Sequence, residues 1–346
     1  MFHNSNPIEM RKSVFILFVF LLPIIIVNSC KKDEPIVVPP ASSLTPVQLE
    51  YPSYFPQMTL NPDNPLTVEG IALGRFLYYD TLLSNDGRRC GNCHHQSEGF
   101  SSYAANSLAH INLGWGNYFL WNGLVEGDVE TAMKFEVEQF FHTDLVRLSN
   151  SAFYQPKFIQ VFGTAQVTSK EVSYALAQYV RSIISCNSKF DRYKRYEENL
   201  TLSELNGMTI FYTEKGDCFH CHTPGLFTDE SFHNNGIDSL FVGVNAGRYN
   251  VTGNSADLGK FKSPTLRNIE LTAPYMHDGR FQTLEQVVEH YNSGVHVTPT
   301  VDPIMTKPAK LYGLLLSTQE KADLVAFLKT LTDTVSTHQE QFSDPF

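Results

Sequence analysis

The stretch Cys90-Gly91-Asn92-Cys93-His94 places two thiols three positions apart, with a histidine directly after the second thiol. This pattern attaches a c-type haem, because both sulfurs can form thioethers with the vinyl groups while the histidine ligates the iron. The same pattern recurs at Cys218-Phe219-His220-Cys221-His222. We therefore expect two covalently bound c-type haems. The cofactor-binding residues would be Cys90, Cys93 and His94 for the first haem, and Cys218, Cys221 and His222 for the second.

A single CxxC pair also occurs in redox dithiols and in zinc sites. Zinc held by both pairs together would leave the two trailing histidines without a role. The chain contains 6 cysteines, of which only Cys30 and Cys186 lie outside the motifs. Cys186 follows an apolar run, so we interpret it as a buried packing thiol rather than a nucleophile. No disulfide framework is expected.

The composition is that of a folded protein without a nucleic-acid partner. Of 346 residues, 42% are hydrophobic and 18% are charged, which allows one large core or two moderate ones. The formal net charge is -10, and the basic residues are scattered. Binding to phosphates needs a basic stripe, so this pattern argues against nucleic acid as a partner.

The first thirty residues predict export. Arg11 and Lys12 precede an apolar run from Val14 to Val27, which is too short for a membrane span. The run ends at Val27-Asn28-Ser29-Cys30, which resembles a bacterial lipobox and implies cleavage before Cys30 and lipidation of that residue. Ordinary cleavage nearby and an uncleaved anchor are the alternatives. Because haem attachment also takes place outside the bacterial cytoplasm, we expect a periplasmic or cell-envelope lipoprotein, held to the membrane through Cys30.

Helices dominate the pattern, and several have recognisable caps. Capping boxes precede apolar residues at helical spacing at Thr168–Glu171, Thr283–Gln286 and Ser317–Glu320. Further helices are expected over Leu66–Tyr79, over Glu130–Phe141, and from Leu202 to Lys215-Gly216. Strand signals are weak, and the Gly- and Asn-rich residues 236–262 should form a loop.

We therefore predict an all-α protein of two cytochrome-c-like haem domains, packed with a site between them. The segments would be a lipoprotein signal peptide (1–29), a tether (30–47), an amino-terminal haem domain (48–200), a carboxy-terminal haem domain (201–335) and a tail (336–346).

From about Pro65 to Leu331 the chain resembles the bacterial di-haem cytochrome c peroxidases, including their MauG-type members. The resemblance rests on the two haem motifs and on the stretches Phe119–Gly123, Phe261–Asn268 and Thr272–Gly279. It implies peroxide reduction at the first haem, electron storage at the second haem, and one calcium ion between the domains.

The resemblance also implies roles for individual residues. Trp121 matches a tryptophan that lies between the two haems and helps to relay an electron; core packing is the alternative for a tryptophan in an aromatic cluster. Asn106, Thr272 and Pro274 match the calcium positions, where one side-chain oxygen and two backbone carbonyls would suit a hard cation.

A peroxidase also needs an acid–base group above the open iron. Glu138 is our candidate. The Asn-Pro that usually precedes this glutamate in the family is missing here, so Glu136 remains an alternative. The two side chains point in different directions on a helix, and only one can face the haem. A solvated helix face is the third interpretation.

Two departures from the family concern the sixth iron ligands. Most of the loop that supplies a distal histidine in some peroxidases is absent between His94 and Asn106, so the first haem is predicted to be open at rest. At the second haem, Tyr291 replaces a methionine, as in MauG-type members. Tyrosinate would lower the reduction potential. The alternatives are that Tyr291 belongs to the core and that Met276, another group or nothing ligates the iron.

The predicted activity is the reduction of hydrogen peroxide to water, with electrons from a small donor such as cytochrome c. One alternative is a MauG-like oxidase that acts on a protein or an organic substrate. The other is a di-haem cytochrome that transfers electrons without turnover.

Overall fold

The computed structural model describes residues 44–310 and 313–346. The predicted signal peptide, the lipidation residue Cys30 and most of the predicted tether lie outside the described residues. Among the helices that the structure describes, none is both long enough and apolar enough to cross a membrane.

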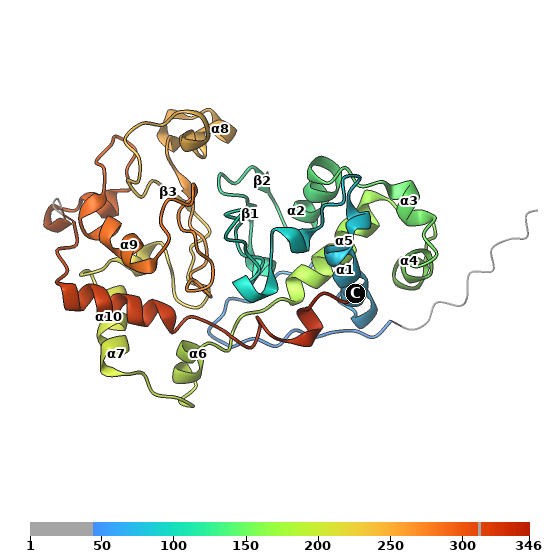
Figure 1. Ribbon diagram of the computed structural model, residues 1–346, viewed down its shortest axis with the longest axis horizontal. Helices are drawn as coiled ribbons and strands as arrows, with labels where there is room; N and C mark the ends of the chain where they lie inside the picture. Colours follow the sequence, from blue (N-terminus) through green and yellow to red (C-terminus); the bar gives the residue numbers. More distant parts are fainter. Residues whose placement is uncertain (1–43, 311–312) are drawn as a thin grey trace, which may run out of the picture. The chain divides into compact units, whose positions relative to one another are not determined.

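The first half of the chain is built from helices that follow and precede the first haem motif (Figure 1). They are α1 (Val68–Tyr79), α2 (Val129–Phe135), α3 (Leu145–Ser149), α4 (Gln155–Phe162) and α5 (Ser169–Ser182). The last turn of α2 continues as a π-helical turn over Glu136–Phe140. Tyr78 of α1 and Tyr179 of α5 are both fully buried in the hydrophobic core of this half.

The second half has a comparable set of helices around the second haem motif. They are α6 (Lys189–Lys194), α7 (Leu202–Phe211), α8 (Tyr249–Thr252), α9 (Leu284–Glu289) and α10 (Thr318–Lys329). Here α9 continues as a π-helical turn over His290–Gly294. Phe211 of α7 and Phe327 of α10 are fully buried in a second hydrophobic core.

Strands are short and few among the described residues. β1 (Tyr118–Phe119) pairs antiparallel with β2 (Val125–Glu126), and β3 (Phe232–His233) pairs antiparallel with β4 (Phe261–Lys262). The chain is therefore helix-rich, as predicted, with two short β-ladders that the sequence did not indicate.

The predicted capping boxes at Thr168, Thr283 and Ser317 are all present. In each, the hydroxyl accepts a hydrogen bond from a backbone N–H of the first turn, and the side chain three positions on bonds back to the cap. These bonds satisfy N–H groups that have no partner within the helix. The starts of α5, α9 and α10 are thus confirmed.

Two predicted helices end differently in the structure. The helix predicted over Glu130–Phe141 becomes π-helical at Glu136, a change that apolar periodicity does not reveal. The helix that begins at Leu202 ends at Phe211 rather than near Gly216, because Tyr212 already leaves helical geometry. The short helices α3, α4, α6 and α8 were not predicted, since none is long enough to establish an apolar period, and α8 lies within residues 236–262, which were expected to form a loop.

A glycine marks the helix crossing in each half. A Cβ on Gly74 of α1 would lie 2.0 Å from the carbonyl oxygen of Ala175 in α5. A Cβ on Gly207 of α7 would lie 1.9 Å from the carbonyl oxygen of Asp323 in α10. Each crossing therefore brings two backbones closer than any larger residue allows, and both crossings join the helix before a haem motif to the last helix of that half.

Residues 336–346, predicted as a tail, pack onto the first half. Phe342 is 5% exposed and belongs to the first core. Its carbonyl oxygen accepts hydrogen bonds from the hydroxyls of Tyr79 and Tyr179, at 2.8 and 2.9 Å. In Figure 1 this end of the chain lies beside α1 and α5.

Candidate haem-binding active site

The two predicted proximal histidines have matching environments. Nδ1 of His94 donates to the carbonyl oxygen of Phe100 at 3.0 Å, and Nδ1 of His222 donates to that of Phe227 at 3.0 Å. A donor bond at Nδ1 fixes the tautomer in which Nε2 is free to bind a metal. Burial lowers the pKa of both imidazoles to about 4, so both are neutral at physiological pH. Both side chains therefore have the form that haem iron requires.

The cysteines of each motif form no disulfide and lie on tight turns. Backbone bonds of 3.0 Å join His94 N to Cys90 O and His222 N to Cys218 O. In both motifs this bond closes one helical turn between the first cysteine and the histidine and so keeps the two residues close, as attachment to one haem requires.

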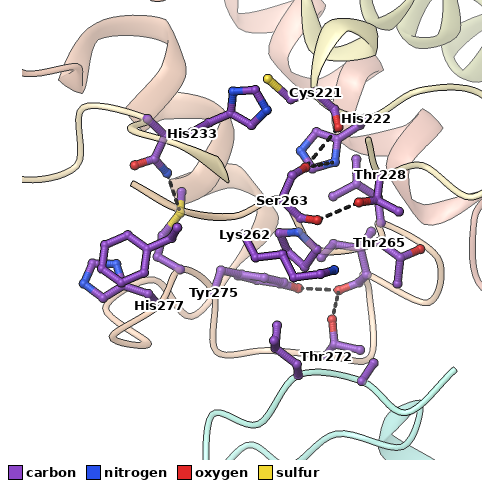
Figure 2. Close-up of a pocket in the computed structure, with 18 of the residues that line it drawn as sticks. Cys221, His222, Thr228, His233, Lys262, Ser263, Thr265, Thr272, Tyr275 and His277 are labelled. Atoms are coloured by element: carbon purple, nitrogen blue, oxygen red, sulfur yellow. Dashed lines mark hydrogen bonds between the residues drawn. The ribbon is translucent and has the colours of Figure 1, made fainter. Parts of the chain in front are cut away.

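A cavity of about 550 Å³ connects the two histidines. Its wall includes His94, His222 and the thiols of Cys218 and Cys221, and the rest is mostly apolar, with Met133, Phe211, Leu284, Val288, Leu324 and Leu328 among the lining residues. Figure 2 shows the part of this wall around His222, where Ser263 lies next to the imidazole. An apolar cavity with two neutral imidazoles and paired thiols fits c-type haem.

A short segment behind each histidine is built in the same way in both halves. Ser107 Oγ donates to the carbonyl of Cys93, and Ser263 Oγ donates to that of Cys221 at 3.0 Å. Five residues after each serine, Asn112 and Asn268 are left-handed, with φ of 56° and 58°. Residues 106–112 and 262–268 are therefore structural counterparts.

The correspondence extends to the helices that cover the cavity. Phe119 pairs with Val125 in one half, and Tyr275 pairs with Phe281 in the other. Next come α2, capped by Asp128, and α9, capped by Thr283, and each runs into a π-helical turn. Glu136 lies eight residues after the cap Asp128, and Tyr291 lies eight residues after the cap Thr283, so the two residues are counterparts.

The structure places Glu136, rather than Glu138, in the cavity wall. Burial raises the pKa of Glu136 to about 7. Glu138 is exposed, accepts a hydrogen bond from Ser169 Oγ at 2.6 Å and lies 3.9 Å from Lys134. The sequence favoured Glu138 over Glu136 as the acid–base group. The π-helical turn changes which side chains share a face of the helix, and the geometry therefore does not match that preference.

Tyr291 also lines the cavity. Nδ2 of Asn235 lies 3.4 Å from its hydroxyl and 3.3 Å from Sδ of Met276. Burial raises the pKa of Tyr291 to about 12. The two candidate ligands named from the sequence, Tyr291 and Met276, thus lie together beside one amide, in the wall that also contains His222.

Trp121 lines the cavity where the two halves meet. Its Nε1 donates to the carbonyl of Asn106 at 3.3 Å, and its own carbonyl accepts from the backbone N–H of Lys262 at 2.9 Å. The Asn106 amide in turn donates to the carbonyls of Met276 and His277, at 3.1 and 3.0 Å. Trp121 is therefore part of a hydrogen-bonded bridge between the halves.

The three predicted calcium positions come together in the same wall. Asn106, Thr272 and Pro274 all line the cavity. A Cβ on Gly279 would lie 3.0 Å from Pro274 and 3.3 Å from the Asn106 amide carbon, which shows how near these two residues are. Among the described residues, no hydrogen bond uses the carbonyl oxygen of Thr272 or Pro274.

Sequence reasoning missed a charged histidine in this wall. His233 lies between two carboxylates, with Nδ1 2.6 Å from Asp302 and Nε2 2.7 Å from Asp229. Burial alone would lower the pKa of His233, but the bonds to both carboxylates raise it to about 12. His233 and Asp302 lie far apart in the sequence, and no local pattern indicates their pairing.

The chain is similar to di-haem enzymes over most of its length. The family model for di-haem cytochrome c peroxidases matches residues 68–199. The methylamine utilization protein MauG of Methylorubrum extorquens is 33% identical over 287 residues, which cover 78% of this chain and 79% of that protein. Cytochrome c551 peroxidase of Nitrosomonas europaea is 31% identical over 299 residues, covering 80% and 83%.

A solved structure extends this likeness to the fold. The crystal structure of a MauG-like protein associated with microbial copper homeostasis matches with a TM-score of 0.77 at 30% identity, over 86% of this chain and 99% of that one. The cavity, the two neutral histidines and the paired thiols are the features that such a di-haem fold needs. The chain belongs to the family of di-haem cytochrome c peroxidases and MauG proteins.

Proposed function

We propose that the protein is a di-haem peroxidase that reduces hydrogen peroxide to water. His94 would hold the haem that supplies the peroxide chemistry, and His222 would hold the haem that receives electrons from a small donor protein such as cytochrome c. A bound haem with a free sixth position reacts with peroxide, whereas a haem with six ligands transfers electrons.

The position of Glu136 carries this proposal. Its carboxyl lines the cavity that contains His94, and its pKa is raised by burial to about 7. A carboxyl with this pKa both accepts and releases protons near neutral pH. It takes a proton from the near oxygen of peroxide and returns it to the far oxygen, which favours heterolytic cleavage of the O–O bond. Complete reduction to two waters consumes two electrons and two protons.

Tyr291 would hold the iron of the second haem together with His222. The residue occupies the position that corresponds to Glu136 and faces the cavity. One half thus presents an acid–base group and the other a group able to ligate iron, which supports a division of labour between the haems. Met276, which shares Asn235 with Tyr291, is the competing ligand.

Two further roles belong to the same proposal. Trp121 relays electrons between the haems, which its place in the bridge between the halves supports. Asn106, Thr272 and Pro274 would hold one calcium ion, since all three line the cavity and the carbonyl oxygens of Thr272 and Pro274 accept no hydrogen bond among the described residues. Export and lipid anchoring at Cys30 rest on the sequence of residues 1–30.

A MauG-like oxidase is the second candidate, with a protein or an organic molecule as substrate. It is favoured by the tyrosine at position 291 and by the 33% identity with MauG. An anionic oxygen ligand stabilises oxidised iron, which would favour storage of oxidising equivalents over rapid turnover.

Steady-state peroxide consumption with reduced cytochrome c tests the proposal. Donor-dependent turnover, together with a high-spin ferric haem that binds cyanide, supports the peroxidase. Accumulation of a long-lived oxidised state without donor-dependent turnover favours the MauG-like oxidase. Two six-coordinate low-spin haems in both redox states would contradict both enzymes and leave an electron-transfer cytochrome.

A further inference from the structure

His94 has a second histidine stacked against it. The rings of His94 and His110 are nearly parallel, with centroids 3.4 Å apart and an interplanar angle of 14°. The carbonyl of Phe100 joins the two residues, because it accepts from Nδ1 of His94 at 3.0 Å and from the backbone N–H of His110 at 2.9 Å. The stack is thus fixed by the backbone.

The second half has the same backbone bonds but a different side chain. The carbonyl of Phe227 accepts from Nδ1 of His222 at 3.0 Å and from the backbone N–H of Leu266 at 3.2 Å. Leu266 is the counterpart of His110 in the matching segments 106–112 and 262–268. An aliphatic side chain at one histidine is therefore replaced by an imidazole at the other.

Tyr78 holds the stacked ring from the other side. Its hydroxyl lies 3.2 Å from Nδ1 of His110, and the tyrosine itself is 0% exposed in the core between α1 and α5. With its backbone tied to Phe100 and its ring tied to Tyr78, His110 has one orientation. It can therefore fix the ring plane of His94.

We infer that His110 is a positioning residue for the proximal ligand of the first haem. The stacked imidazole prevents rotation of the His94 ring and offers a polarisable aromatic face to a ligand that becomes more positive when the iron is oxidised. Leucine offers neither effect at the second haem. The pair lowers the reduction potential of the first haem and so makes the two proximal sides unequal.

This inference rests on His94 as the proximal ligand in the proposed function, but its test needs no peroxide. The ferric holoprotein is studied by electron paramagnetic resonance and by redox titration in the wild type, His110→Leu and Tyr78→Phe. His95→Leu is the matched control, because His95 is adjacent in sequence but points to Glu98 and is 40% exposed. The signals of the second haem serve as an internal reference.

His110→Leu is expected to change the first-haem resonance and to raise its potential by at least about 59 mV, which is a tenfold change in the one-electron equilibrium. Tyr78→Phe should shift the first-haem resonance and potential in the same direction but by less. His95→Leu should leave both the resonance and the potential unchanged. An unchanged resonance and potential in His110→Leu with both haems attached would overturn the inference. If His110→Leu does not fold, an unchanged resonance and potential in Tyr78→Phe would overturn the inference. Absence of donor-dependent peroxide turnover in the wild type, with these shifts present in the variants, would instead count against the proposed function alone.

Discussion

Glu136 and Tyr291 occupy the same position in the two halves of the chain: each lies eight residues after a helix cap, near the start of a π-helical turn, and faces the haem cavity. A π-helical turn adds a residue to the helix and redirects the side chains after it. The same local distortion therefore presents an acid in one half and a phenol in the other.

Glu136→Gln should slow peroxide cleavage by roughly 10²-fold or more, because general acid–base catalysis contributes at least that factor. The wild-type rate should rise with pH through about 7 as the Glu136 carboxylate forms, and the variant should lose this dependence. Glu138→Gln is the matched control and should retain both rate and pH profile. Stopped-flow mixing with peroxide measures the rate of peroxide cleavage and its pH profile. The opposite pattern would return the role to Glu138.

Stability should depend on pH through the same carboxyl. The pKa of Glu136 is raised by burial from 4.5 to about 7, so the folded state holds an extra proton between these values and stability falls as pH rises through this window. Above the window the ionised carboxylate is buried at a cost. Glu136→Gln should therefore be more stable than the wild type at pH 8 by roughly 3 kcal/mol, and nearly equal to it at pH 4. Denaturant unfolding at pH 4 and pH 8 measures the free energy of unfolding of both proteins. The same difference between variant and wild type at the two pH values would contradict the prediction.

Tyr291→Met should raise the potential of the second haem by at least about 59 mV, the equivalent of a tenfold change for one electron, because a thioether replaces an anionic oxygen. Met276→Leu should leave that potential and the ferric spectrum unchanged. A spectrum altered by Met276→Leu but not by Tyr291→Phe would identify Met276 as the ligand.

Trp121→Phe should slow electron equilibration between the haems by roughly tenfold or more, about 1.4 kcal/mol in barrier. The indole and its bond to Asn106 are lost, whereas haem attachment should be complete. Trp115→Phe is the control, since Trp115, the other tryptophan of the chain, donates its hydrogen bond to the Pro56 carbonyl instead. Flash reduction followed at both haem bands measures the rate. Equal rates in the two variants would exclude a special role for Trp121.

Arg267→Met should destabilise the protein by roughly 3–5 kcal/mol, because it leaves the Asp191 carboxylate buried without its partner. The two side chains are 0% exposed and their charged atoms lie 2.8 Å apart. Glu197→Gln breaks the exposed ion pair with Arg195 and should cost less than about 1 kcal/mol. Thermal unfolding compares the two, and similar losses would mean that Arg267 contributes no more than a surface charge.

Patterns contained in a few residues were predictable from the sequence, and relationships across distance were not. The capping box at Thr168 and the two haem motifs each need only a handful of neighbouring residues, and all are where the sequence indicates them. The choice between Glu136 and Glu138 depends on the π-helical turn, which apolar spacing does not encode. The pairing of His233 with Asp302 depends on how strand β3 meets a distant turn. The likeness of the halves becomes clear only from shared backbone bonds such as those to Phe100 and Phe227.

The packing of Phe342 has a consequence for the order of folding. A side chain close to the carboxy-terminal end completes the core beneath the first haem motif, and its carbonyl satisfies the hydroxyls of Tyr79 and Tyr179. During synthesis the amino-terminal half emerges first, and its core gains the Phe342 side chain only after residue 342 has followed. The core of the first half is therefore complete only when the two ends of the folded chain have met.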